Sequence, residues 1–130
     1  MLFSESLKKN QDFQKVYQTG ESKANKYLVL YRRANGCEKN RMGISVSKKV
    51  GNSVVRHHMC RLIRESYRLN EALFLPGYDL VVVVRPLARD RSFHEIERAL
   101  LHLMRLQGLT RSAEFSLEKN EDEKNINLHD

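Results

Sequence analysis

The sequence predicts a single α+β domain in which helices lie on a small sheet. Amphipathic helical patterns occupy the beginning, the middle and the end of the first 110 residues, and segments of strand-forming residues lie between them. The order helix, strands, helix, strand, helix is typical of α+β proteins and also of α/β-like ones. With 130 residues, of which 41% are hydrophobic, the chain has material for one core.

The first helix is predicted to begin at Asn10, because Phe13, Val16 and Tyr17 recur at helical spacing, and to end at Gly20. A strand follows over residues 27–31, which are all aromatic or aliphatic, and two arginines carry it to residue 33.

Alternating residues predict a second strand over residues 41–47. Met42, Ile44 and Val46 lie on one face, and polar or small residues, Ser45 among them, occupy the other. This strand therefore has one buried face.

The central helix is predicted to run from Asn52 or Ser53, either of which can cap it, to about Asn70. On a helical wheel one side is suited to packing on the sheet and carries Val55, Met59, Leu62, Ile63 and Ser66. The nearly opposite side carries His57, Arg61, Arg64 and Arg68, with Arg56 at its border.

A further strand over residues 78–84 follows a Pro-Gly turn, and its run of β-branched residues predicts burial on both faces. Residues 92–95 fit the capping box of a third helix, and Gly108 supplies the matching end.

Charge divides the chain into two parts. Residues 1–110 contain 20 Lys or Arg against 10 Asp or Glu, whereas residues 111–130 contain 3 against 6. We expect an anionic partner for the domain of residues 1–110 and a separate, acidic, disordered tail over residues 111–130. Two unpaired cysteines, no signal-like segment and no long apolar run predict a cytoplasmic protein without a membrane partner.

The arginine side of the central helix is the strongest candidate site. Charged helix faces are usually solvated, but such faces mix signs, and here Glu65 alone interrupts the cations. We therefore interpret this side as a surface for a polyanion, with RNA as the first candidate. The candidate residues on the helix are Arg56, His57, His58, Arg61, Arg64 and Arg68.

The turn before this helix adds Lys48, Lys49 and Asn52. Unpaired N–H groups of a first helical turn carry the positive end of the helix dipole, so a phosphate is expected to bind there beside two ammonium groups. An ordinary capped helix start accounts for the same residues without a ligand.

Aromatic residues give a second candidate site. Phe13 and Tyr17, together with Tyr31, can stack on nucleobases, although aromatic pairs at helical spacing more often belong to a core. Ser45 lies on the outward side of its strand, where a small hydroxyl allows a ligand to approach the sheet. A solvent-exposed serine explains it equally well.

The sequence contains no catalytic motif of the GxSxG, Walker or HExxH type, so acid–base catalysis by the protein itself is not expected. His57 and Cys60 have a spacing suited to chelation, but a structural zinc site requires about four ligands. We therefore predict no metal site and interpret the histidine as an RNA contact.

Residues 43–50, the Gly-Asn turn at 51–52 and the arginine-rich helix that follows closely resemble the protein subunit of bacterial ribonuclease P. Residues 54–56 and 61–65 match within the helix, and the resemblance extends to residues 12–17, 27–32 and 79–86. It covers most of residues 5–108, with the separate segments in the same order and spacing.

This resemblance implies an α+β fold with a four-stranded mixed sheet and three helices in a two-layer sandwich. It also implies a left-handed crossover into the central helix, whereas such crossovers are right-handed in nearly all proteins. The implied function is that of a non-catalytic protein subunit, because in this family the RNA subunit cleaves precursor tRNA with Mg²⁺.

The same resemblance implies the partners. Residues 56–68 would face the ribonuclease P RNA, and the 5′ leader of precursor tRNA would lie in a cleft formed by Phe13, Tyr17, Tyr31 and Ser45. Mg²⁺ is expected through the RNA subunit alone, and a protein oligomer is not expected.

The chain departs from the family at three signature positions. His57, His58 and Cys60 stand where the family has Asn, Arg and Lys, so two formal charges are absent at neutral pH. We expect RNA binding to tighten below about pH 6.5, where imidazoles take up a proton.

Two other classes of protein share part of the pattern. A ribosomal or other structural RNA-binding protein with a related sandwich would have the basic helix, but would not explain the aromatic first helix. A helix-turn-helix DNA-binding protein needs a second helix directly before the basic one, whereas here a strand precedes it.

Overall fold

Five strands form one mixed sheet in the computed structural model, which describes residues 4–111. They are β1 (Ser4–Ser6), β2 (Glu21–Ala24), β3 (Leu28–Ala34), β4 (Asn40–Ser45) and β5 (Tyr78–Val84), in the spatial order β1-β4-β5-β3-β2. β4 is parallel to β1 and to β5, whereas β3 is antiparallel to β5 and to β2. The mixed sheet is confirmed, but it has five strands instead of the four that the resemblance implies, because β1 and β2 both pair at the edges of the three strands that the residue patterns predict.

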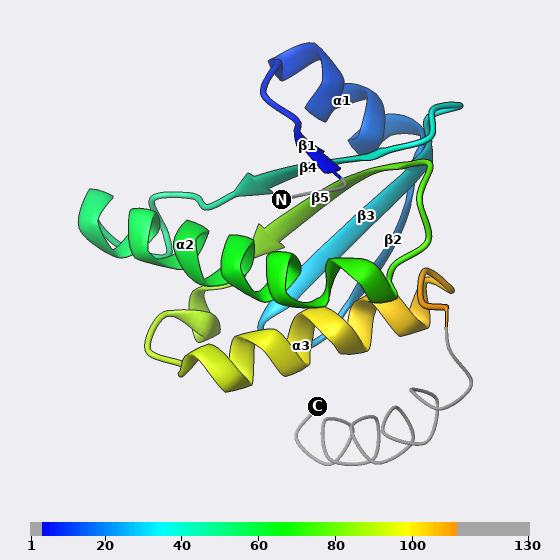
Figure 1. Cartoon of the computed structure of the whole chain (residues 1–130). Helices are drawn as coiled ribbons and strands as arrows, with labels where there is room; N and C mark the ends of the chain where they lie inside the picture. The colour runs from blue at the N-terminus through cyan, green and yellow to red at the C-terminus, as the bar shows by residue number, and fades with distance from the viewer. Residues whose placement is uncertain (1–3, 112–130) are drawn as a thin grey trace.

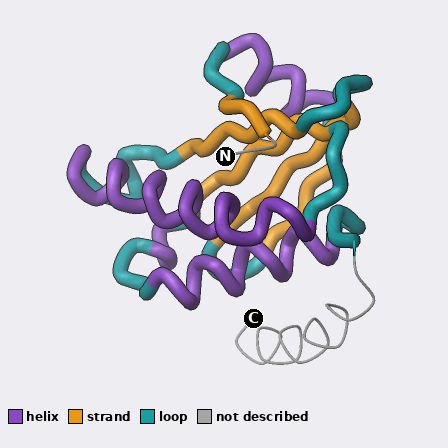
Figure 2. Tube along the Cα trace, viewed as in Figure 1, coloured by secondary structure: helices purple, strands orange, loops and turns teal. Residues whose placement is uncertain are grey.

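The helices are α1 (Asn10–Thr19), α2 (Ser53–Asn70) and α3 (Phe93–Leu106), with short 3₁₀ turns at Glu71–Leu73 and Pro86–Ala88. α2 and α3 lie side by side on one face of the sheet and form the predicted second layer (Figures 1 and 2). α1 packs on the opposite face, against β3 and β5, and covers only part of it.

Strand β5 is buried on both faces, as its β-branched run predicts. Leu80, Val82 and Val84 contact the main core beneath α2 and α3, whereas Val81 belongs to a smaller core beneath α1. In register, Val81 lies between Tyr31 of β3 and Gly43 of β4. This register aligns residues of three strands on the face that α1 occupies.

The crossover from β4 through α2 to β5 is left-handed. Seen from the side of α2, both strands run from right to left and β5 lies below β4 (Figure 1). The first turns of α2 project beyond the ends of these strands (Figure 1).

The predicted caps are present. The Asn52 side chain accepts a hydrogen bond from the backbone N–H of Val55 at 3.0 Å, and Ser92 and Glu95 form the reciprocal capping box of α3. Gly108 adopts the left-handed conformation that ends α3, with φ of +72°. Gly20 has a different role, because its φ is −85° and an added Cβ would lie 2.6 Å from the carbonyl oxygens of Val16 and Arg32.

Packing continues slightly past the expected domain boundary. The backbone N–H of Arg111 donates to the carbonyl of Leu73 at 2.9 Å, next to a bridge between Phe74 and Thr110. The rest of the predicted acidic tail lies outside the described residues. Within residues 4–111, no helix is both long enough and apolar enough to cross a membrane.

Candidate nucleic-acid interface

The inner side of α2 is fixed to the sheet. Met59, Ile63 and Tyr67 are fully buried there, as the wheel predicts for the first two. The Tyr67 hydroxyl lies 2.8 Å from Ser4 Oγ and accepts a hydrogen bond from Asn40 Nδ2 at 3.2 Å, so it joins α2 to β1 and β4. Burial raises the pKa of Tyr67, which keeps this hydroxyl neutral. α2 therefore presents its other side as a rigid surface.

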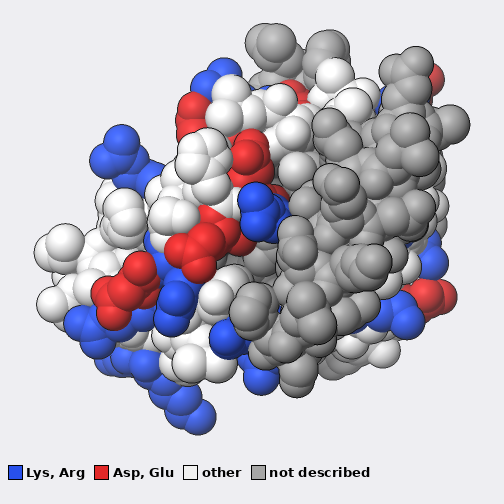
Figure 3. Space-filling view, turned by 90° about the horizontal axis from the view of Figure 1, so that it is seen from below, with Lys and Arg blue, Asp and Glu red and all other residues white. Residues whose placement is uncertain are grey.

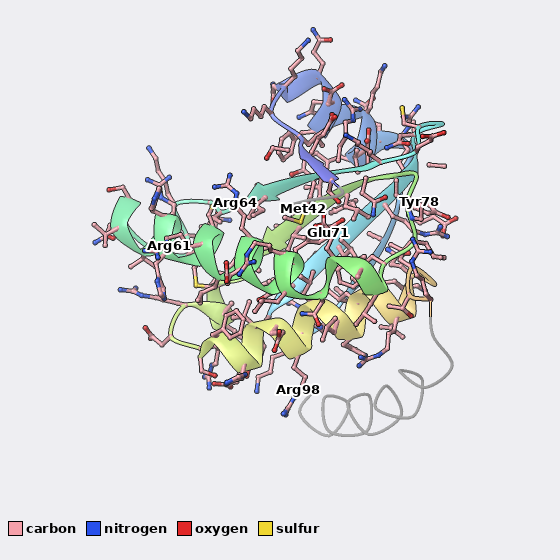
Figure 4. The ribbon with its side chains drawn as sticks, viewed as in Figure 1. Met42, Arg61, Arg64, Glu71, Tyr78 and Arg98 are labelled. Carbon is pink, nitrogen blue, oxygen red and sulfur yellow. The ribbon has the colours of Figure 1, made fainter. Side chains whose placement is uncertain are left out.

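The outward side of α2 carries the predicted residues in exposed positions: the arginines Arg61, Arg64 and Arg68, together with His57. Glu65, the only acidic residue of α2, is paired with Arg68 through Nε at 3.1 Å and through Nη2. A hydrogen bond from Arg68 holds the pKa of Glu65 below its usual range. Within the described part of the chain, Arg61 and Arg64 form no salt bridge, and both are labelled in Figure 4. Their charges are available to an external anion.

The start of α2 extends this surface. Lys48, Lys49 and Asn52 are exposed in the connection from β4, and the first turn of α2 contains no acidic residue. A shallow hollow over the first turns is lined by Ser53, Val54, His57, His58 and Arg61. In the view from below, Lys and Arg side chains are most numerous at the left end of the described surface, where some Asp and Glu side chains lie beside them (Figure 3). The structure thus brings the predicted helix and turn residues to one end.

Two residues at the border of this surface, Arg56 and Cys60, are partly buried and are not simply exposed cations. Arg56 is half-buried, and its Nε is a buried donor without a hydrogen-bond partner among the described residues. Burial raises the pKa of the Cys60 thiol, an effect that the nearby Arg64 only partly opposes. Cys60 therefore adds no charge at neutral pH.

The aromatic residues of the second candidate site form one cluster on the opposite face of the sheet. The ring centroids of Phe13 and Tyr17 are 6.4 Å apart, and those of Tyr17 and Tyr31 are 5.0 Å apart in an edge-to-face arrangement. All three rings are half-exposed and pack around the buried Val16 and Val81. The cluster is therefore both a small core and a partly open aromatic surface.

Phe13 lies directly on the backbone of Gly43. A Cβ added to Gly43 would be 2.8 Å from Cε1 of Phe13 and closer still to Cζ. Ser45 lies two residues further along the same face of β4, half-exposed and opposite Val83 of β5. The structure thus places the four predicted residues along one face, with the aromatic rings at one end and the Ser45 hydroxyl beyond them.

An ion-pair network beside this cluster was not predicted from the sequence. Arg41 donates to Asp79 from Nε at 2.8 Å and from Nη2 at 2.6 Å, and its Nη1 lies 3.6 Å from Asp12 of α1. Burial of the Asp79 carboxyl opposes ionisation, but hydrogen bonds from Arg41 and Asn35 outweigh it and hold the pKa of Asp79 below its usual value. In the sequence these residues are an arginine and two acids near the starts of strands or helices. This pattern is too common to predict which of them form ion pairs.

Among residues 4–111, no group of three or more His, Cys, Asp or Glu side chains gathers where it could hold a metal ion. His57 and Cys60 are therefore not joined by further ligands from this part of the chain.

A basic helix that projects from one face of the sheet and an aromatic surface on the other define an α+β protein suited to nucleic acid. The family model for ribonuclease P matches residues 1–107. The ribonuclease P protein component of Lachnoclostridium phytofermentans is 54% identical over 111 residues, which cover 85% of this chain and 96% of that protein. The corresponding protein of Alkaliphilus metalliredigens is 53% identical over 105 residues, with 81% and 95% covered.

Solved structures agree with the sequence relatives. The Staphylococcus aureus RNase P protein superimposes with a TM-score of 0.77 at 36% identity and covers 83% of this chain and 99% of its own. The RNase P protein of Thermotoga maritima gives a TM-score of 0.73 at 32% identity, with 78% and 96% covered. The chain belongs to the ribonuclease P family, as a protein component of the endoribonuclease that matures the 5′ ends of tRNAs.

Family membership confirms the predicted fold class and function and removes the ribosomal alternative. The helix-turn-helix alternative is excluded by the structure, because β4 leads into α2 where that motif requires a helix. Which residues contact which RNA remains a prediction.

Proposed function

We propose that the outward side of α2, with the turn before it, binds the ribonuclease P RNA, and that the cleft between α1 and the sheet binds the 5′ leader of precursor tRNA. The observation that carries the proposal is the pair of exposed, unbridged arginines, Arg61 and Arg64, on a helix that projects beyond the sheet. The two surfaces lie on opposite sides of the sheet, so one protein can contact two RNA segments at once.

The surface on α2 suits the backbone of a folded RNA. Arginine guanidinium groups bind phosphate in a bidentate geometry, and recognition of RNA helices depends on shape and backbone contacts. Arg61, Arg64 and Arg68 are spaced over about 10 Å along one side of α2. The remaining members of the proposed surface are Lys48, Lys49, Asn52, Arg56, His57 and His58. The buried Nε of Arg56, which lacks a partner among the described residues, is a donor that an RNA phosphate would satisfy.

The cleft on the other face suits a single strand. Unpaired bases stack on aromatic side chains without strong sequence preference, and Phe13, Tyr17 and Tyr31 offer half-exposed rings. The Ser45 hydroxyl, next along the same face, can hydrogen bond to a base or to the sugar–phosphate backbone. A leader of variable sequence is the kind of ligand that such a surface accommodates.

The Mg²⁺ that cleavage requires is proposed to be held by the RNA subunit and not by this chain. The carboxylates nearest the cleft, Asp12 and Asp79, are already engaged by Arg41. The protein contributes binding and orientation, and the RNA contributes the reaction.

Replacement of Arg64 by Ala should weaken binding of ribonuclease P RNA and lower the slope of log K against log salt by about one. Arg68→Ala should have a smaller effect, because Arg68 is already paired with Glu65. Arg111→Ala is the control, since Arg111 donates to the carbonyl of Phe74 away from this surface. The measurement is RNA affinity across a salt series, and equal effects of all three substitutions would indicate diffuse electrostatics instead of a site.

RNA affinity should rise as the pH falls from 8 to 5.5 at fixed salt, because a protonated imidazole at His57 or His58 would add cationic charge to the start of α2. A variant with both histidines replaced by Gln should lose this dependence while it keeps its affinity at pH 8. A flat profile for the unmodified protein would show that these histidines do not face the RNA.

A further inference from the structure

Arg41 is the only described side chain that joins β4, β5 and α1 through ion pairs. In register Arg41 of β4 lies opposite Asp79 of β5, and both carboxylate oxygens of Asp79 accept hydrogen bonds from its guanidinium. The third nitrogen, Nη1, faces Asp12 in the first turn of α1 at 3.6 Å. One planar group therefore links two parallel strands to a helix on the outer face.

The pair at the centre of this link is held firmly. The Asp79 side chain is 3% exposed, and its Oδ1 accepts a further hydrogen bond from Asn35 Nδ2 at 3.0 Å. A hydrogen bond to Asp79 is the largest influence that raises the pKa of Arg41. Both groups stay ionised, and their orientation is fixed by several bonds at once. The guanidinium therefore presents Nη1 to Asp12 from a rigid position.

The other end of the link is the start of α1. Lys9, which caps α1, makes no side-chain capping hydrogen bond, so this first turn lacks the usual local anchor. Asp12 supplies a negative charge in that turn, where it also suits the helix dipole. The contact with Arg41 thus adds a side-chain attachment at the start of α1, beyond the buried Leu7 that precedes the helix and donates its backbone N–H to the carbonyl of Met42 at 2.9 Å.

The position of α1 decides where two of the three rings of the aromatic cluster lie, because Phe13 and Tyr17 both belong to α1. Asp12 precedes Phe13 in the chain, and Phe13 rests on Gly43, two residues after Arg41 on the same face of β4. The contacts Asp12–Arg41 and Phe13–Gly43 are therefore successive attachments of α1 along one strand. A shift of the first attachment moves the Phe13 ring relative to Tyr31 and Ser45.

We propose that Arg41 is a positioning residue for recognition of the precursor-tRNA leader: through Asp79 and Asp12 it sets the place of α1 and hence the width of the aromatic cleft. This inference rests on the proposed leader cleft. It predicts that the contact with Asp12 affects leader binding although neither Arg41 nor Asp12 belongs to the aromatic surface.

The test uses the holoenzyme reconstituted from this protein and a bacterial ribonuclease P RNA. The readout is the ratio of affinities for precursor tRNA with a leader and for mature tRNA, measured for Arg41→Gln, Asp12→Asn and Phe13→Ala. Lys39→Ala is the matched control, because it also removes one cation near β4 but breaks only an exposed 3.8 Å contact with Glu5. Asp12→Asn keeps the buried pair of Arg41 and Asp79, so it separates the position of α1 from the stability of the sheet.

All three variants are expected to reduce this ratio by about fivefold or more, as loss of a stacking contact would, while Lys39→Ala leaves it unchanged. Asp12→Asn should reduce the affinity ratio without changing the midpoint of urea unfolding. In the same variant the NMR resonance of the Gly43 amide should shift, because the Phe13 ring moves. A reduced ratio for Phe13→Ala, with normal ratios for Arg41→Gln and Asp12→Asn, would overturn the positioning role of Arg41. The proposed leader cleft would stand. A normal ratio for Phe13→Ala would overturn the leader cleft and, with it, this inference.

Discussion

Replacement of Gly43 by Ala is expected to destabilise the domain by about 1–3 kcal/mol, the usual range for an overpacked site. The cause is contact and not backbone strain, because Gly43 does not adopt the left-handed conformation. A methyl group at this position would lie 2.8 Å from Cε1 of Phe13, so α1 or its ring must move. The measurement is urea or thermal unfolding of the two proteins.

A double substitution isolates this cause. In a Phe13→Ala background the added methyl group has room, so Gly43→Ala should cost much less there than in the unmodified protein. Equal costs in both backgrounds would show that the ring does not rest on Gly43. Because Phe13 belongs to the proposed cleft, Gly43→Ala should also weaken binding of leader-containing precursor tRNA more than binding of mature tRNA.

The elements with a strong local signal were predicted closely from the sequence. α2 begins at its predicted Asn52 cap and ends at Asn70, and β5 occupies the predicted residues 78–84. These elements have an amphipathic pattern, a capping side chain or a β-branched run within their own residues. β1 and β2 were missed, since three and four mostly polar residues carry no such pattern. Their strand conformation depends on pairing with β4 and β3.

The two candidate surfaces also differ in how far a local sequence pattern predicts them. The outward side of α2 follows from helical periodicity alone, so a wheel was sufficient to separate Arg64 from the buried Met59. The cleft depends on contacts between distant segments, such as Phe13 with Gly43 and Tyr17 with Tyr31. From the residues alone a core was the more common explanation for these rings, and the structure shows that they form a small core while remaining only partly buried.

The Arg41 network could not be predicted for a related reason. Its pairing with Asp79 requires β4 and β5 to be parallel neighbours, and the connection between them includes the whole of α2. Neither the neighbour relation nor the register is encoded in a local pattern. Family resemblance supplied the topology in outline but not this ion pair.

Addition of this protein to a bacterial ribonuclease P RNA is expected to raise the rate of precursor-tRNA cleavage at low Mg²⁺ by at least about tenfold, which corresponds to a decrease of about 1.4 kcal/mol in activation free energy. If the proposed surface on α2 binds the RNA, its cations should neutralise phosphates that the RNA must otherwise screen with Mg²⁺. The effect should therefore shrink as the Mg²⁺ concentration rises. The proposed leader cleft should add a second contribution, which depends on the presence of a leader.

The two surfaces can be separated in one assay of this kind, the cleavage rate at low Mg²⁺ with substrates of long and minimal leader. The unmodified protein should stimulate both reactions, and more strongly with the long leader. Arg61→Ala combined with Arg64→Ala should remove stimulation of both, whereas Phe13→Ala should remove only the advantage of the long leader. Absence of stimulation by the unmodified protein, or an equal loss with both substrates for all variants, would contradict an RNA surface on α2 and a separate leader cleft beneath α1.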